Sequence, residues 1–204
     1  MNTKSVHIST GNSKMGRIPS FSLPSGRSCS AAACKSCYCE GCYAGKLERL
    51  RPSVRNAYAD NYSVASDDLP GLESYLNWYF DSPNAPRLFR VHVSGDFFSA
   101  EYLAMWVRVT ASHPDTKFLA FTKQYNLVGD WGRANMPNNF RIVLSAWPGV
   151  EIPDGLTQEF PVAYMQDGRE TRVPEDARAC SGNCSDCAEC WYLGGGQSVV
   201  FHKH

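Results

Sequence analysis

The chain has 204 residues, which is enough for one domain with a buried core, and we treat residues 1–204 as a single unit. Its 20 basic and 20 acidic side chains balance, so bulk charge favours neither a nucleic-acid nor a membrane partner. No apolar run reaches the roughly 20 residues of a membrane helix, and the opening MNTKSVHISTGNSK lacks the apolar core of a secretion signal, so we expect a cytoplasmic protein.

The predicted elements begin with a strand-like run, RIPSFSLPSG (residues 17–26), which leads into a cysteine-rich loop at residues 29–42. Helix signals follow this loop. Pro52 suits the first turn of a helix that runs toward Tyr62. A second helix follows DDLP, where Asp67 or Asp68 can cap it, and the helical period places four apolar or aromatic residues on one buried stripe: Leu72, Tyr75, Leu76 and Tyr79.

Four apolar runs of strand length come next, at residues 88–93, 117–122, 140–145 and 161–166. A clear helix, residues 99–111 with Ser99 as its cap, separates the first two runs. Strands joined by crossovers of helix length predict a parallel sheet, so we expect an α/β core over residues 88–166, either open or curled into a barrel. The last run, SVVFHKH, predicts a final strand.

Parallel sheets place their ligand sites at the carboxyl ends of the strands. The end of the first core strand reads VSGDFF, in which Gly95 lets a ligand approach the backbone closely and Asp96 supplies a fixed carboxylate. Within the same strand, Arg90 and His92 alternate. Either both side chains face the interior of a barrel, or His92 is a buried histidine with hydrogen-bond partners.

Nine cysteines form two groups, and the 137 residues between the groups contain none. Thiols stay reduced in the cytosol, where closely spaced cysteines bind metals more often than they form disulfides. We therefore predict that all nine are metal ligands: Cys29, Cys34, Cys37, Cys39, Cys42, Cys180, Cys184, Cys187 and Cys190.

The second group, residues 180–190, has gaps of three, two and two residues, which resemble the cluster-binding loops of bacterial ferredoxins. Zinc sites more often pair one short knuckle with a distant one, so we favour an iron-sulfur cluster. Trp191 is expected to pack beside this site. In the first group two arrangements stay open: two knuckles closing one four-cysteine site, or three thiolates holding a cluster with one open iron.

A strand, a cysteine-rich loop and a parallel α/β series whose next strand ends in a glycine–acid pair resemble the radical S-adenosylmethionine (SAM) enzymes. That resemblance implies a partial (β/α) barrel, a [4Fe-4S] cluster on the loop, and contact between SAM and the turn at Ser94, Gly95 and Asp96. The superfamily's C-x3-C-x2-C spacing does not occur in the N-terminal group.

More closely, GNSKMGRIPSFSLPSGRSC, CYAGK, RVHVSGDFFSAEYL and CSDCAECW resemble the gene product 88 family of phage and bacterial proteins. The resemblance matches Cys29 and Cys42 to the outer cysteines of the family's first group. It matches Cys184, Cys187 and Cys190 to its terminal triplet. Cys34, Cys37 and Cys39 stand where that family usually has one cysteine.

Three functions follow from these expectations. The first is SAM-dependent radical chemistry on a small-molecule or protein substrate, with a reductant such as ferredoxin or flavodoxin and one or two [4Fe-4S] clusters. The second is a non-catalytic iron-sulfur protein that transfers electrons, senses redox state or binds a host factor. The third is a structural zinc protein. If the chain is phage-encoded, its location is the host cytoplasm.

Overall fold

The computed structural model describes residues 5–29, 42–147, 151–166 and 173–202. These residues form one eight-stranded sheet in the order β1-β2-β3-β4-β5-β6-β8-β7. Its strands are β1 (Ile8–Ser9), β2 (Ser20–Phe21), β3 (Leu88–Val91), β4 (Lys117–Thr122), β5 (Phe140–Ala146), β6 (Val162–Gln166), β7 (Arg178–Ala179) and β8 (Ser198–His202). Only β1 and β2 pair in antiparallel fashion. The predicted mainly parallel α/β core is confirmed, and the sheet is open.

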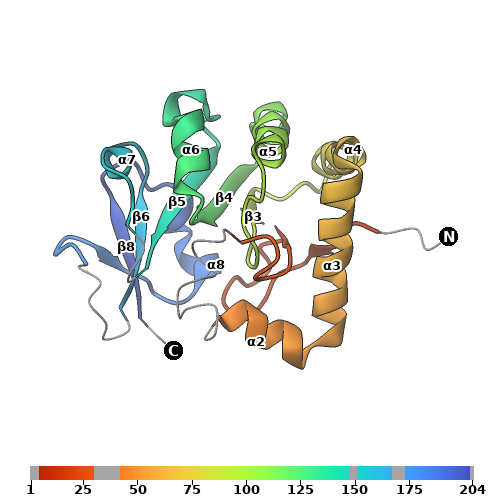
Figure 1. The fold of residues 1–204 in the computed structure, drawn as a ribbon, viewed down its shortest axis with the longest axis horizontal. Coiled ribbons are helices and arrows are strands. Elements are labelled where there is room, and N and C mark those ends of the chain that lie inside the picture. Colours follow the sequence, from red (N-terminus) through yellow and green to blue (C-terminus); the bar gives the residue numbers. More distant parts are fainter. Residues whose placement is uncertain (1–4, 30–41, 148–150, 167–172, 203–204) are drawn as a thin grey trace.

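The helices and 3-10 turns of the described residues are α2 (Tyr43–Leu50), α3 (Pro52–Asp67), α4 (Leu69–Phe80), α5 (Ala100–Ser112), α6 (Tyr125–Trp131), η1 (Arg133–Asn135), α7 (Leu156–Glu159), α8 (Cys184–Cys187) and η2 (Glu189–Trp191). Figure 1 shows α4, α5, α6 and α7 in a row along one side of the sheet, with α8 on the other side. No helix in the described ranges is long and apolar enough to cross a membrane.

Local sequence signals account for where the larger helices begin. Pro52 occupies the first turn of α3, where its missing N–H is not needed. Asp68 caps α4 by accepting a hydrogen bond from Gly71 N at 3.0 Å, and Ser99 caps α5 by accepting one from Tyr102 N at 3.2 Å. In α4 the deeply buried residues are Leu72, Leu76 and Phe80, so the predicted stripe is displaced by one residue at its end.

The main core lies between the sheet and the row of helices. Alternate strand residues enter it, including Phe89, Phe118 and Phe140, which are at most 1% exposed. Their partners come from α4 and α5, and Phe80 packs edge-on against Phe89 with ring centroids 4.9 Å apart. The helices therefore cover this face of the sheet and bury its core.

The other side of the sheet, called here the second face, carries the remaining strand residues. Leu119, Val143, Ala163 and Val199 form a second core with Trp191 and Leu193 from the C-terminal segment, and Phe121 and Phe201 pack at its margin. Arg90 belongs to this face because it lies opposite Leu119 in the β3–β4 register. The C-terminal cysteine segment thus covers the second face in place of a helix layer.

Candidate metal centre

Three hydrogen bonds fix the C-terminal cysteine segment to the rest of the protein. Cys180 N donates to Val200 O at 2.9 Å, and Cys184 N donates to Lys14 O at 2.8 Å. The indole Nε1 of Trp191 donates to Phe89 O at 3.2 Å, which places the residue after Cys190 against the backbone of β3. The segment is therefore attached to β8, to the N-terminal region and to the centre of the sheet.

The four cysteines of this segment are free thiols that are neither deeply buried nor fully exposed. Cys180, Cys184 and Cys190 pack against the second-face core. Cys180, Cys187 and Cys190 line a small pocket with Leu193 and Val199. The amide of Gly182 also donates to the Cys180 sulfur at 3.4 Å, a contact that stabilises negative charge on sulfur. Folding thus brings all four thiols to one side of the sheet.

The described ranges contain no ready-made set of three cysteine, histidine, aspartate or glutamate side chains at metal-binding geometry. The donor chemistry nevertheless suits a metal, because four thiols of one short segment are the usual ligands of both zinc and iron-sulfur sites. None of the described cysteines is consumed by a disulfide. Ligation would require the thiols to converge by local rearrangement of the segment.

Two cations, Lys14 and Arg90, lie near these thiols. Burial raises the pKa of Cys190 to about 12, and the Arg90 guanidinium acts in the opposite direction. Burial also raises the pKa of Cys184, against the influence of Lys14 and then Arg90. Both cations therefore favour the thiolate form that metal binding requires.

The N-terminal cysteine loop is described only at its two ends, because Cys34, Cys37 and Cys39 lie outside the described residues. Cys29 and Cys42 are half-exposed, and Cys42 immediately precedes α2. The neighbour of Cys29, Ser28, accepts a hydrogen bond from Asp96 N at 3.3 Å. This hydrogen bond places the N-terminal end of the loop at the carboxyl end of β3.

Glu48 of α2 provides the second attachment of the loop. Its Oε1 accepts hydrogen bonds from Ser94 Oγ at 3.2 Å and from Ser25 N at 2.8 Å. Because Ser28 and Glu48 lie on opposite sides of the loop in sequence, the turn at residues 94–96 is bound to both flanks of the first cysteine group. The sequence resemblance expects the same proximity.

Within this turn, protein groups occupy the polar atoms. Asp96 is 5% exposed, and its carboxylate accepts hydrogen bonds from Thr122 Oγ1 at 2.6 Å, Phe97 N at 2.8 Å and Lys123 N at 2.9 Å. Burial raises the pKa of Asp96 even though these hydrogen bonds act to lower it. Gly95 has a φ of 83°, and a Cβ there would meet Ser28 and Leu23 rather than open space. The described contacts of the turn are structural, and its role in SAM binding stays a prediction.

His92 departs from the strand. Its φ of 65° lies in the left-handed region, so β3 ends at Val91 and the imidazole turns toward α5. There Nε2 makes a hydrogen bond of 2.9 Å with Tyr102 Oη, while Nδ1 has no hydrogen-bond partner within the described part of the chain. Burial, and then the charge of Arg90, lower the pKa of His92 to about 3. The side chains of Arg90 and His92 therefore do not face one common interior, as a barrel would require. His92 is buried, but only one of its two ring nitrogens forms a hydrogen bond within the described residues.

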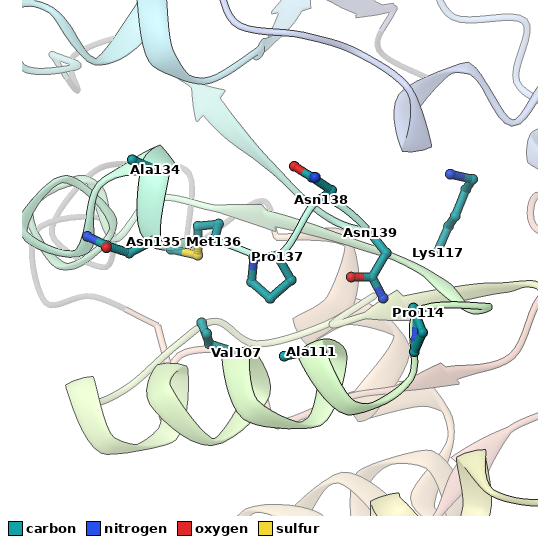
Figure 2. Close-up of a pocket in the computed structure, with 10 residues that line it drawn as sticks. All are labelled: Val107, Ala111, Pro114, Lys117, Ala134, Asn135, Met136, Pro137, Asn138 and Asn139. Atoms are coloured by element: carbon teal, nitrogen blue, oxygen red, sulfur yellow. The ribbon is translucent and has the colours of Figure 1, made fainter.

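One hollow of the described surface lies elsewhere. It is an open groove of about 590 Å³. Figure 2 shows its lining residues between α5 and the segment that leads into β5. It is lined by Val107, Ala111, Pro114, Lys117 and residues 134–139. Since Lys117 begins β4 and Asn139 precedes β5, the groove lies at the amino ends of the strands, away from both cysteine groups. It offers a single charged side chain and is not the candidate site.

Sequence reasoning missed the two cations beside the second cysteine group. Lys14 lies in a polar segment that carries no motif. Arg90 gave a signal, because an arginine at an inward position of an apolar strand needs an anionic partner. That signal shows that Arg90 needs an anionic partner. It does not identify Cys184 and Cys190, which lie 94 and 100 residues later in the chain.

Comparisons with known proteins agree with the sequence resemblance. The family model described as gene product 88 matches residues 2–193. The chain is 37% identical over 223 residues to the "Gene 88 protein" of Mycobacterium phage L5 and 30% identical over 227 residues to that of Mycobacterium phage D29. Each alignment covers 98% of this chain and 93% of the relative. No solved structure matches significantly. The chain is therefore a member of the gene product 88 family.

Proposed function

We propose that the protein binds an iron-sulfur cluster, of the [4Fe-4S] type, through Cys180, Cys184, Cys187 and Cys190. The observation that supports this most is the position of four free thiols of one segment on the second face, beside two cations. Four thiolates carry more negative charge than the metal they bind carries positive charge, and nearby cations balance this net negative charge. Their close spacing suits a cluster better than a zinc ion.

The protein supplies the environment that such a cluster needs. A cluster bound by four cysteines provides one-electron transfer and leaves no iron open to a substrate. Trp191 and Leu193, which are 4% and 2% exposed, form an apolar wall on the sheet side of the thiols. Gly182 N and the two cations stabilise charge on the sulfurs. These features favour an electron-transfer or redox-sensing role for this group.

The direct test is to purify the protein without oxygen and to measure iron, acid-labile sulfide and the low-temperature paramagnetic resonance spectrum. We expect a brown protein with iron and sulfide in equal amounts. The variants C184S and C187S should lose the signal of this cluster, whereas S181A, an exposed position in the same loop, should retain it. A colourless protein with stoichiometric zinc would overturn the proposal in favour of a structural zinc site.

SAM-dependent radical chemistry is the second candidate, with a further cluster on the first cysteine group. It is supported by the hydrogen bonds that attach both flanks of that loop to the turn at residues 94–96. In this case the open parallel sheet would act as the partial barrel of the radical-SAM enzymes. The partners would be a reductant such as ferredoxin or flavodoxin and a small-molecule or protein substrate in the cytoplasm of a phage host.

The two candidates predict different products. If the second one holds, chemically reduced protein converts SAM to 5′-deoxyadenosine, and a variant that lacks Cys29 and Cys42 does not. Absence of turnover by a protein that carries its full complement of iron would leave the electron-transfer, redox-sensing or host-factor-binding role.

A further inference from the structure

We propose that Arg90, together with Lys14, is the built-in counter-charge of the C-terminal cysteine centre, and that this pair sets the reduction potential of the cluster bound there. The inference rests on the proposed function, because it assumes a cluster at residues 180–190. It goes further by assigning a task to two side chains that are not ligands.

The position of Arg90 is the first argument. Its guanidinium lies on the second face, where Cζ stands 4.0 Å from the centroid of the Phe121 ring. Its Nε donates a hydrogen bond of 3.0 Å to His92 O, which fixes the direction of the side chain. Phe121 packs on the same second-face core as Cys184 and Cys190. The bond from Trp191 Nε1 to Phe89 O also brings the chain beside Cys190 next to the strand residue that precedes Arg90.

Lys14 approaches the cysteines from the other side. Its carbonyl accepts the hydrogen bond from Cys184 N, and its Nζ lies 4.6 Å from the centroid of the Phe201 ring. The rings of Phe201 and Phe121 meet edge-on with centroids 5.7 Å apart. Arg90, the two phenylalanines and Lys14 therefore form one continuous row along the second face, with a cation at each end and the cysteine segment beside it.

The charge balance is the second argument. Neither Arg90 nor Lys14 forms an ion pair with an aspartate or glutamate of the described ranges. A half-buried guanidinium without a carboxylate needs another anion nearby. A metal centre held by four thiolates carries a net charge of about −2, which two cations balance. Cys190 and then Cys184 lie close enough to Arg90 for their thiolates to act on its guanidinium.

The consequence concerns the electron that the cluster accepts. Reduction adds one negative charge, and a fixed cation in a poorly hydrated site stabilises that charge strongly. Arg90 remains protonated at neutral pH, although burial lowers its pKa to about 10. It therefore acts as a permanent charge, and its removal should make the cluster harder to reduce.

The sheet provides a matched control. Arg90, Leu119 and Arg141 occupy one row across β3, β4 and β5. Burial lowers the pKa of Arg141 as it does that of Arg90, but the charged neighbour of Arg141 is Arg133 and not a cysteine. R90M and R141M therefore remove the same chemical group from equivalent places on the same face, and only one of them lies beside the cysteines.

The experiment is a redox titration of anaerobically purified wild-type, R90M, R90K, K14M and R141M protein, followed by paramagnetic resonance. R90M should shift the potential of the cluster to a more negative value, R90K should remain near the wild type, and R141M should not shift. K14M should shift in the same direction as R90M. An R90M potential equal to that of R141M would overturn the inference.

If R90M fails to fold, K14M decides, and an unchanged K14M potential would overturn the inference. Wild-type protein without iron and sulfide would instead overturn the proposed function itself, so the two failures are distinguishable.

Discussion

Thr122 Oγ1 donates a hydrogen bond of 2.6 Å to Asp96 Oδ1 and so joins the loop after β3 to the end of β4. The same carboxylate also accepts hydrogen bonds from the amides of Phe97 and Lys123. In all three hydrogen bonds the other residue is the donor, so none of them requires a proton on the Asp96 carboxylate. The carboxylate therefore acts as a bridge between the carboxyl ends of two strands, at the edge of the sheet where both flanks of the first cysteine group are attached.

This arrangement predicts the effect of D96N. An asparagine would present an NH2 group to at least one of the three donors, and a buried donor would lose its acceptor. We expect the free energy of unfolding to fall by about 2 kcal/mol in urea denaturation at pH 7. D68N is the control, because Asp68 is an exposed helix cap and asparagine caps as well as aspartate, so its change should stay within about 0.5 kcal/mol. Equal effects of both substitutions would show that the bridge contributes little.

Much of the architecture is predictable from local patterns. Residues 117–122 form β4 with the predicted bounds, and α5 begins after its predicted cap. In these segments, apolar periodicity and capping agree with the tertiary packing. The strand predicted over residues 88–93 ends early because His92 adopts a left-handed conformation. Histidine is enriched in that conformation but adopts it too rarely for the residue alone to predict it.

The site was less predictable than the fold. The spacing of the thiols indicates metal-binding chemistry, but the two cations beside the thiols, Arg90 and Lys14, are far from residues 180–190 in sequence. For Gly95, the sequence predicts a close approach of another group but not which group approaches. The sequence shows that the backbone needs a residue without a side chain, and the structure shows that Leu23 and Ser28 fill that space. Long-range contacts of this kind have no local pattern from which to predict them.

Trp191 attaches the C-terminal segment to the sheet, and W191F tests this attachment. Phenylalanine keeps most of the apolar contact but loses the hydrogen bond to Phe89 O, so we expect a loss of about 1–2 kcal/mol of unfolding free energy. W78F is the matched control, because Trp78 is 69% exposed whereas Trp191 is 4% exposed. Urea denaturation of both variants checks the prediction. A W191F variant as stable as W78F would mean that the indole hydrogen bond does not stabilise the segment.

His92 makes stability depend on pH. The pKa of His92 is about 3 in the folded protein and about 6.5 when unfolded, so the unfolded chain binds the proton first as the pH falls. Its contribution is therefore intact above pH 6.5 and is lost as the pH falls toward 3, at up to about 1.4 kcal/mol per pH unit.

The variant H92N removes this titration and tolerates the left-handed backbone. It should be less stable than the wild type at pH 7, because it loses the Tyr102 contact, but its stability should fall less steeply between pH 6.5 and 4. Urea denaturation at several pH values measures both effects. A slope that is unchanged in H92N would contradict the assignment.

The residues packed around Gly95 leave no space for a side chain there. The variant G95A, compared with G155A, separates this steric effect from backbone strain. A Cβ at this position would lie 2.5 Å from Ser28 Oγ and 2.6 Å from Leu23 Cβ, two contacts that cannot be relieved without moving the turn. Gly155 has a similar φ, 86° against 83°, and nothing within 4 Å of its Cβ position. G155A should therefore cost only the backbone term of about 1–2 kcal/mol.

G95A adds a steric clash in the core to that cost, so we expect it to lose at least about 3 kcal/mol or to yield little folded protein. Urea denaturation and the yield of folded protein compare the two variants. If G95A were no more costly than G155A, the packing of Leu23 and Ser28 against the turn would not explain the glycine. The close approach that Gly95 permits would then be available to a ligand, as the resemblance to radical-SAM enzymes implies.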